Sequence, residues 1–158
     1  MPNKPKTTGS LSSVQVQVQV NIEASPVRVW EAFVNEIDSW WLPDFYVTPE
    51  PHEIKIELWP GGRIFETGPD SSGLLWGTIL HIVPDKELTI GSYIAPPWGG
   101  PANTFLRMQL QETDGGTSLT FTDSMFGVVN AESGQQIETS WQRLLEEGLK
   151  AYVERVKS

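Results

Sequence analysis

One short segment limits the fold of this chain more than any other: from Val14 to Asn21 the sequence reads VQVQVQVN, alternating valine with a polar residue. Successive side chains of a β-strand point to opposite faces. The valines therefore share one face, and the polar residues share the other. This pattern predicts a half-buried strand, so the chain needs a sheet whose valine face is covered by other elements.

Six further strands are predicted, because apolar runs alternate with turn-forming residues. They cover residues 52–59, the stretch between the turns at 60–62 and 70–73, and residues 74–83, 87–94, 105–111 and 117–124. Their connections have the length of hairpins, which predicts an antiparallel sheet. The strand at 74–83 is apolar on both faces, so the sequence does not orient it.

Two helices are predicted, one before and one after the six later strands in the sequence. Ser25 provides an N-cap oxygen for the first helix, and Pro26 suits its first helical position. The apolar stripe of this helix consists of Val27, Trp30, Phe33 or Val34, and Ile37. Apolar positions from Ile137 to Tyr152 recur at helical spacing and predict a long C-terminal helix. Because this helix must place its stripe on the sheet, the predicted fold class is α+β, a curved antiparallel sheet that grips one helix.

Composition excludes several classes of function. The 158 residues are 39% hydrophobic, which predicts a single domain over residues 14–158 after a polar, disordered tail at 1–13. A net charge of −9 argues against nucleic acid as a partner. The chain has no cysteine, so it has no thiolate nucleophile. No apolar run follows the lysines of the tail, so we expect a cytoplasmic protein without a membrane segment.

Several motifs together resemble one known family. They are the opening VQVQVNIEASPVRVWEAF, the WW before a proline, PGGRIFETG, WGTILHIVPDKELTI, GGTSLTF and a tryptophan in the last helix. In this order they resemble the bacterial relatives of the activator of the ninety-kilodalton heat-shock chaperone ATPase, within the START-like (SRPBCC, birch-pollen-allergen-like) superfamily. The resemblance spans roughly Val14 to Val156. It implies a helix-grip fold that encloses a cavity between the sheet and the last helix.

Two carboxylates are candidates for chemistry inside that cavity. Alternation along the strand after Gly62 places Ile64 and Glu66 inward, with Arg63 and Phe65 outward. On a later strand, the face that carries Leu119 and Phe121 also carries Asp123. An apolar cavity would raise the pKa of these carboxyl groups and could prepare them for general acid or base catalysis. The alternative is that each is hydrated near a rim or accepts a hydrogen bond from a Trp or Tyr donor.

The seven tryptophans indicate a small-molecule site, because six of them lie at element ends or in loops, where a helix-grip cavity would open. Simple core filling is the alternative. The predicted ligand-binding set consists of Trp41, Glu66, Trp76, Trp98, Met108, Phe121, Asp123, Trp141 and Leu145. His52 and His81 are the only histidines and lack the spacing of zinc ligands, so no metal and no cofactor are expected.

Three functions follow from these patterns. The first is binding of an apolar or aromatic small molecule in the cavity, with no catalytic residue. The second is a cyclase or hydrolase that uses Glu66 and Asp123. The third, implied by the resemblance, is an interaction protein that stimulates a chaperone ATPase, with a role in the stress response. Either a monomer or a homodimer fits the sequence.

Overall fold

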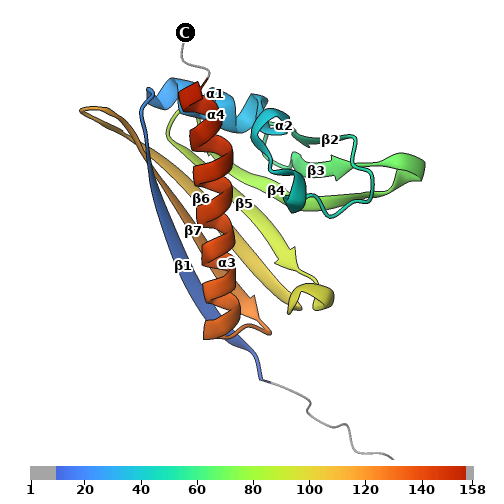
Figure 1. Cartoon of the computed structure of the whole chain (residues 1–158). Coiled ribbons are helices and arrows are strands. Elements are labelled where there is room, and N and C mark those ends of the chain that lie inside the picture. The colour runs from blue at the N-terminus through green and yellow to red at the C-terminus, as the bar shows by residue number, and fades with distance from the viewer. Residues whose placement is uncertain (1–9, 156–158) are drawn as a thin grey trace, which may run out of the picture.

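Seven strands form one antiparallel sheet in the order β1-β7-β6-β5-β4-β3-β2 (Figure 1). The computed structural model describes residues 10–155. The strands are β1 (Ser12–Ile22), β2 (Glu53–Ile56), β3 (Arg63–Thr67), β4 (Gly73–Val83), β5 (Glu87–Ile94), β6 (Ala102–Thr113) and β7 (Gly116–Gly127). The first nine residues of the predicted tail lie outside the described residues, and Ser12 and Ser13 are already part of β1.

The long C-terminal helix lies across one face of this sheet, as Figure 1 shows. It consists of α3 (Ala131–Arg143), a π-helical segment η4 (Leu144–Lys150) and α4 (Ala151–Arg155). The predicted fold class, an α+β helix-grip fold, is therefore confirmed. The inward faces of β1, β5, β6 and β7 carry alternate buried residues that pack under the helices, and the valines Val16, Val18 and Val20 are among them.

The C-terminal helix begins at Ala131, six residues before the predicted start at Ile137. The first turn is polar, so it shows no apolar period. Its start is fixed instead by a capping box: the Asn130 side chain accepts from the Ser133 N–H, and the Ser133 hydroxyl accepts from the Asn130 N–H, each at 2.9 Å. Periodicity alone misses such a start.

The first helix is divided into α1 (Pro26–Asn35) and α2 (Ile37–Trp40). The predicted N-cap is confirmed, because the Ser25 hydroxyl accepts a hydrogen bond from the Arg28 N–H at 3.3 Å. The placement of Val27 on the apolar stripe is wrong, since its side chain is 61% exposed. It lies in the first turn of α1, where the helix has no buried residue before Val29. Within residues 10–155 there are also three short 3-10 turns: η1 (Pro43–Phe45), η2 (Pro69–Ser71) and η3 (Pro96–Trp98).

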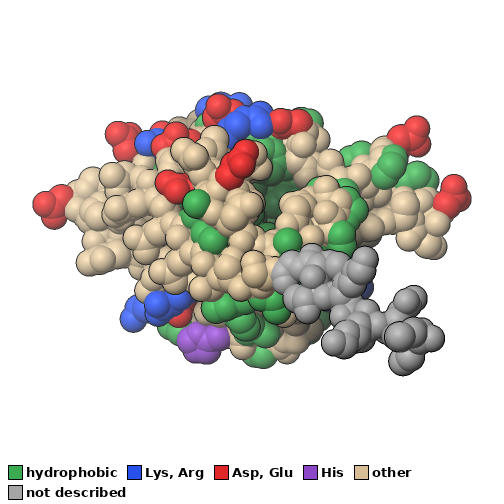
Figure 2. Space-filling view, turned by 90° about the horizontal axis from the view of Figure 1, so that it is seen from below, with side chains coloured by type: hydrophobic (Ala, Val, Ile, Leu, Met, Phe, Trp, Pro, Cys, Tyr) green, Lys and Arg blue, Asp and Glu red, His purple; other side chains and the backbone are tan. Residues whose placement is uncertain are grey.

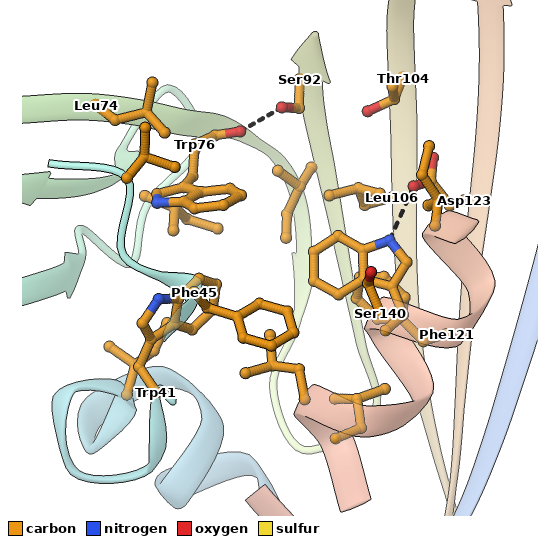
Figure 3. Close-up of a pocket in the computed structure, with 18 of the residues that line it drawn as sticks. Trp41, Phe45, Leu74, Trp76, Ser92, Thr104, Leu106, Phe121, Asp123 and Ser140 are labelled. Atoms are coloured by element: carbon orange, nitrogen blue, oxygen red, sulfur yellow. Dashed lines mark hydrogen bonds between the residues drawn. The ribbon is translucent and has the colours of Figure 1, made fainter. Parts of the chain in front are cut away.

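Two β-bulges orient β4, the strand that the sequence leaves open. Opposite β3, the register shifts between the Ile64–Gly77 and Phe65–Leu75 pairs, which makes Trp76 an extra residue. Opposite β5, the register shifts again between Ile79 and His81. Each bulge changes which parity of residue faces inward. Simple alternation therefore cannot describe this strand, and the first bulge directs Trp76 toward the helix side (Figure 3).

Gly148 in η4 marks a close contact between the last helix and α2. A Cβ atom at this position would lie 2.6 Å from the carbonyl oxygen of Trp40. The absence of a side chain at Gly148 therefore permits close packing of the last helix against α2. Leu144, Leu145 and Leu149 surround it and are buried. None of the helices within residues 10–155 is long and apolar enough to span a membrane.

Candidate functional site

A cavity of about 510 Å³ lies between the inner face of the sheet and the last helix. Figure 2 shows the hollow from one end, with hydrophobic side chains in its depth. The segment from α2 to η1 forms one wall, β4 to β7 form the floor, and α3 with the start of η4 forms the opposite wall. This is the space that the helix-grip resemblance implies.

Most of the predicted ligand-binding residues line this cavity. They are Trp41, Trp76, Trp98, Phe121, Asp123, Trp141 and Leu145. Glu66 and Met108 do not line it, since Met108 is fully buried under its strand neighbours and the Glu66 carboxylate is engaged elsewhere. Further lining residues, outside the predicted set, include Phe45, Leu74, Ser92, Thr104, Leu106 and Ser140. Strand parity with Met108 could have found Leu106, whereas Thr104 lies before the predicted strand at 105–111, since β6 begins at Ala102.

Three aromatic rings form one end of the cavity (Figure 3). The Trp41 ring meets the Trp76 ring edge to face, with 5.2 Å between ring centroids, and meets the Phe45 ring at 6.2 Å. Such tilted contacts suit the charge distribution of aromatic rings. The indole N–H of Trp41 is buried and has no hydrogen-bond partner among the described residues. This cluster gives the cavity a rigid, largely apolar wall.

Glu66 supports that wall from behind. The predicted inward direction of Ile64 and Glu66 on β3 is confirmed, because both residues are buried while Arg63 is exposed. One carboxylate oxygen of Glu66 accepts from the backbone N–H of Val47, at 2.8 Å, and from that of Thr48. The other oxygen accepts from the Trp76 indole N–H at 3.0 Å. The Trp-donor alternative therefore holds for Glu66, which holds the backbone of Val47 and Thr48 and the Trp76 ring and does not line the cavity.

Asp123 lies at the other end of the cavity, on β7. One of its oxygens accepts from the Trp141 indole N–H at 3.0 Å. The Trp141 ring packs on Phe121, with the centroids 4.6 Å apart, so this indole lies against the sheet. The second oxygen of Asp123 is buried and has no partner among the described residues. Asp123 is thus the buried carboxylate that contributes to the cavity lining.

The residues paired with Asp123 in the sheet are apolar. Val16 on β1 and Leu106 on β6 are its directly opposite neighbours in the sheet. Burial raises the pKa of Asp123 to about 6, and the hydrogen bond from Trp141 opposes this rise only in part. The expectation that one cavity carboxyl has a raised pKa therefore applies to Asp123.

An ion pair bridges the mouth of the cavity. The Arg143 guanidinium on α3 contacts the Asp44 carboxylate in η1 at 2.6 Å and lies over the Phe45 ring, 5.5 Å from its centroid. The hydrogen bond from Arg143 lowers the pKa of Asp44. Because both side chains are well exposed, the pair contributes little to stability. It does join the aromatic wall to the last helix.

Metal ligands do not gather at this site. Within the part of the chain that the structure describes, no group of three or more His, Asp or Glu side chains could hold a metal ion. His81 lies 4.0 Å from Glu87, with its side chain mostly exposed, and neither His52 nor His81 lines the cavity. What the cavity offers is aromatic surface with a few polar groups.

Comparison with known proteins agrees with this architecture. The model of the family described as Activator of Hsp90 ATPase homolog 1-like protein matches residues 23–154. No curated protein matches the chain. Many solved structures match it in fold.

Three of these structures illustrate the similarity. Protein MLL2253 from Mesorhizobium loti has a TM-score of 0.71 at 18% identity, over 92% of this chain and 100% of that one. The Aha1 dimer from Colwellia psychrerythraea has a TM-score of 0.64 at 19% identity, over 92% and 99%. DynU16, from the dynemicin biosynthetic locus, has a TM-score of 0.68 at 19% identity, over 90% of this chain and 48% of that one.

Proposed function

This chain belongs to the family of Activator of Hsp90 ATPase homolog 1-like proteins, and from that premise we propose that it binds an apolar, aromatic small molecule. The fold of this family is in general a ligand-binding fold. The proposed binding site is the cavity beneath the last helix. The observation that carries this proposal is the cavity itself, about 510 Å³ in volume and lined mainly by aromatic and aliphatic side chains. Sites for small molecules typically have about this size and composition.

The aromatic wall supports binding over simple core filling. Trp41, Phe45 and Trp76 are held in place by edge contacts and by the Glu66 hydrogen bond, yet their rings border a space that they do not fill. Rings fixed before binding reduce the entropy that a ligand loses on association. A preformed apolar cavity is therefore the feature that a binding protein needs.

The enzymatic alternative requires Glu66 and Asp123 in the cavity, and only Asp123 lines it. Glu66 accepts three hydrogen bonds and does not line the cavity, so it is poorly placed as a base. Stimulation of a chaperone ATPase is an alternative that rests on the family description. A monomer or a homodimer and a cytoplasmic location remain predictions from the sequence.

A cavity-filling variant tests the proposal. We expect N-phenyl-1-naphthylamine, an uncharged dye whose fluorescence rises in apolar surroundings, to bind the wild-type protein. Leu106→Trp places a larger ring in the cavity and should weaken dye binding at least about tenfold, because the ligand and the new ring compete for the same volume. Fluorescence titration measures both affinities.

The matched control is Phe105→Trp, one residue earlier on β6 and on the outward, exposed side of the sheet. It should bind the dye like the wild type. Circular dichroism would establish that both variants are folded. Absence of dye binding to the wild type, or equal binding to Leu106→Trp, would contradict the proposed function.

A further inference from the structure

The floor of the cavity carries one small polar patch. It consists of Thr104 on β6 and Asp123 on β7, which are 4% and 3% exposed and both line the cavity. Ser92 on β5 lies directly opposite Thr104 and also lines the cavity, but its hydroxyl already donates to the Trp76 carbonyl oxygen. Asp123 lies opposite Leu106, and Thr104 lies opposite Met125, so the two polar residues are diagonal neighbours on the inward face. Diagonal side chains on neighbouring strands lie within reach of a shared third group.

Each member of this patch has unused hydrogen-bonding capacity. The Asp123 oxygen that does not bind Trp141 is buried without a partner among residues 10–155. No hydrogen bond joins the Thr104 hydroxyl to another described residue, and Figure 3 shows the Thr104 and Asp123 side chains on the same side of the cavity. Buried polar groups in proteins nearly always have a partner. The patch therefore indicates where the polar group of a ligand would lie.

The chemistry of the patch selects that group. A carboxylate oxygen accepts a hydrogen bond, and a threonine hydroxyl can donate one. A ligand hydroxyl can donate to the first and accept from the second at the same time, which a ketone or an ether cannot do. A ligand cation would have to leave water for a cavity lined mainly by apolar side chains, and the desolvation of such an ion pair is costly.

We propose that the cavity selects an uncharged aromatic molecule with a hydroxyl group, which donates to the free oxygen of Asp123 and accepts from the hydroxyl of Thr104, an inference that rests on the proposed function. The aromatic body of the ligand extends from this patch toward the wall of Trp41, Phe45 and Trp76. The apolar wall supplies affinity, and the patch supplies orientation and selectivity.

The test is displacement of N-phenyl-1-naphthylamine by four probes that share one biphenyl body: 4-phenylphenol, biphenyl, 4-methoxybiphenyl and 4-phenylbenzylamine. For the wild-type protein, 4-phenylphenol should displace the dye at about tenfold lower concentration than biphenyl or 4-methoxybiphenyl, because it alone both donates and accepts at the patch. The amine, a cation at neutral pH, should be no better than biphenyl.

Variants assign the preference to the patch. Asp123→Leu and Thr104→Val should each reduce the preference for 4-phenylphenol over biphenyl while biphenyl still displaces the dye. Should Asp123→Leu fail to fold, Asp123→Asn serves instead with 4-methoxybiphenyl as the probe. An amide that accepts from Trp141 turns its NH₂ toward the ligand and can donate to an ether oxygen, so the advantage of 4-phenylphenol over 4-methoxybiphenyl should shrink. Thr122→Val, on the outward face of β7, is the matched control and should keep it.

Results other than these would contradict the hydroxyl inference alone, or that inference together with the proposed function. If the dye and biphenyl bind but 4-phenylphenol has no advantage, or if the variants keep that advantage, the hydroxyl inference is wrong and the proposed function stands. Tightest binding of 4-phenylbenzylamine would overturn the inference in favour of a cationic ligand. If neither the dye nor any probe binds the wild-type protein, both proposals are wrong.

Discussion

Glu66→Ala is expected to lower the free energy of unfolding by about 3–5 kcal/mol, one of the two largest effects that we predict for a single substitution. Glu66 is 1% exposed and accepts hydrogen bonds from the Val47 N–H, the Thr48 N–H and the Trp76 indole. Alanine would leave these three donors without their acceptor. Urea denaturation followed by circular dichroism measures the loss.

Glu66→Gln provides a graded comparison. Its amide oxygen can still accept from the two backbone N–H groups, but its NH₂ group would face the Trp76 indole N–H, donor against donor. We expect a loss of about 1–3 kcal/mol, smaller than for alanine. Glu112→Ala, at an exposed position near the end of β6, is the control and should change little. Equal stability of Glu66→Ala and wild type would show that this network does not hold the wall.

Asp123→Asn is expected to gain stability relative to the wild type as pH rises. The pKa of Asp123 is about 6 in the folded protein and 3.8 in its ordinary state, so the folded wild type binds more protons between these values. Its stability therefore falls as pH rises through this window, because the buried carboxyl must ionise. The two pKa values differ by about 2, and each unit corresponds to about 1.4 kcal/mol, which gives about 3 kcal/mol in total.

Asparagine cannot ionise and keeps an oxygen for the Trp141 indole, so the variant should lack this loss. The difference in unfolding free energy between Asp123→Asn and wild type should rise by about 3 kcal/mol from pH 3.5 to pH 7 and then stay level. Urea denaturation at a series of pH values measures this difference, with Asp114→Asn in an exposed turn as the control. A difference that does not change with pH would show that Asp123 is solvated in the folded protein.

Much of the sheet could be predicted from the sequence because most strands have one solvent-exposed face, which produces an alternating pattern of polar and apolar residues. The alternating segment from Val14 to Asn21 is the clearest case, and its glutamines do lie on the outer face, where Gln15, Gln17 and Gln19 donate to hydroxyl groups of β7. β4 could not be oriented, because two bulges change its parity and a bulge depends on the neighbouring strand.

The candidate site was only partly predictable for a similar reason. Parity placed Glu66 and Asp123 on inward faces, but it could not show that Glu66 is covered by the backbone of residues 47 and 48, which are distant in sequence. Asp123 lacks such a covering donor at its second oxygen. Phe45 was missed because it lies in a 3-10 turn, where no periodic pattern marks the direction of a side chain.

The tryptophans now separate into two groups, which the sequence could not distinguish. Trp41, Trp76, Trp98 and Trp141 line the cavity, as does the body of Trp40, whereas Trp30 is buried elsewhere and Trp59 is exposed. An indole N–H signal is sensitive to a ring or a hydroxyl group placed beside it. The protein therefore carries its own reporters, together with internal controls.

The most direct test of ligand binding in the cavity is the indole region of a ¹H–¹⁵N correlation spectrum recorded during titration with 4-phenylphenol. Our account predicts that the signals of Trp41, Trp76 and Trp141 shift with one common dissociation constant while those of Trp30 and Trp59 stay in place. Unchanged cavity signals at saturating probe, or shifts of Trp30 and Trp59 as large as those of the cavity residues, would contradict it.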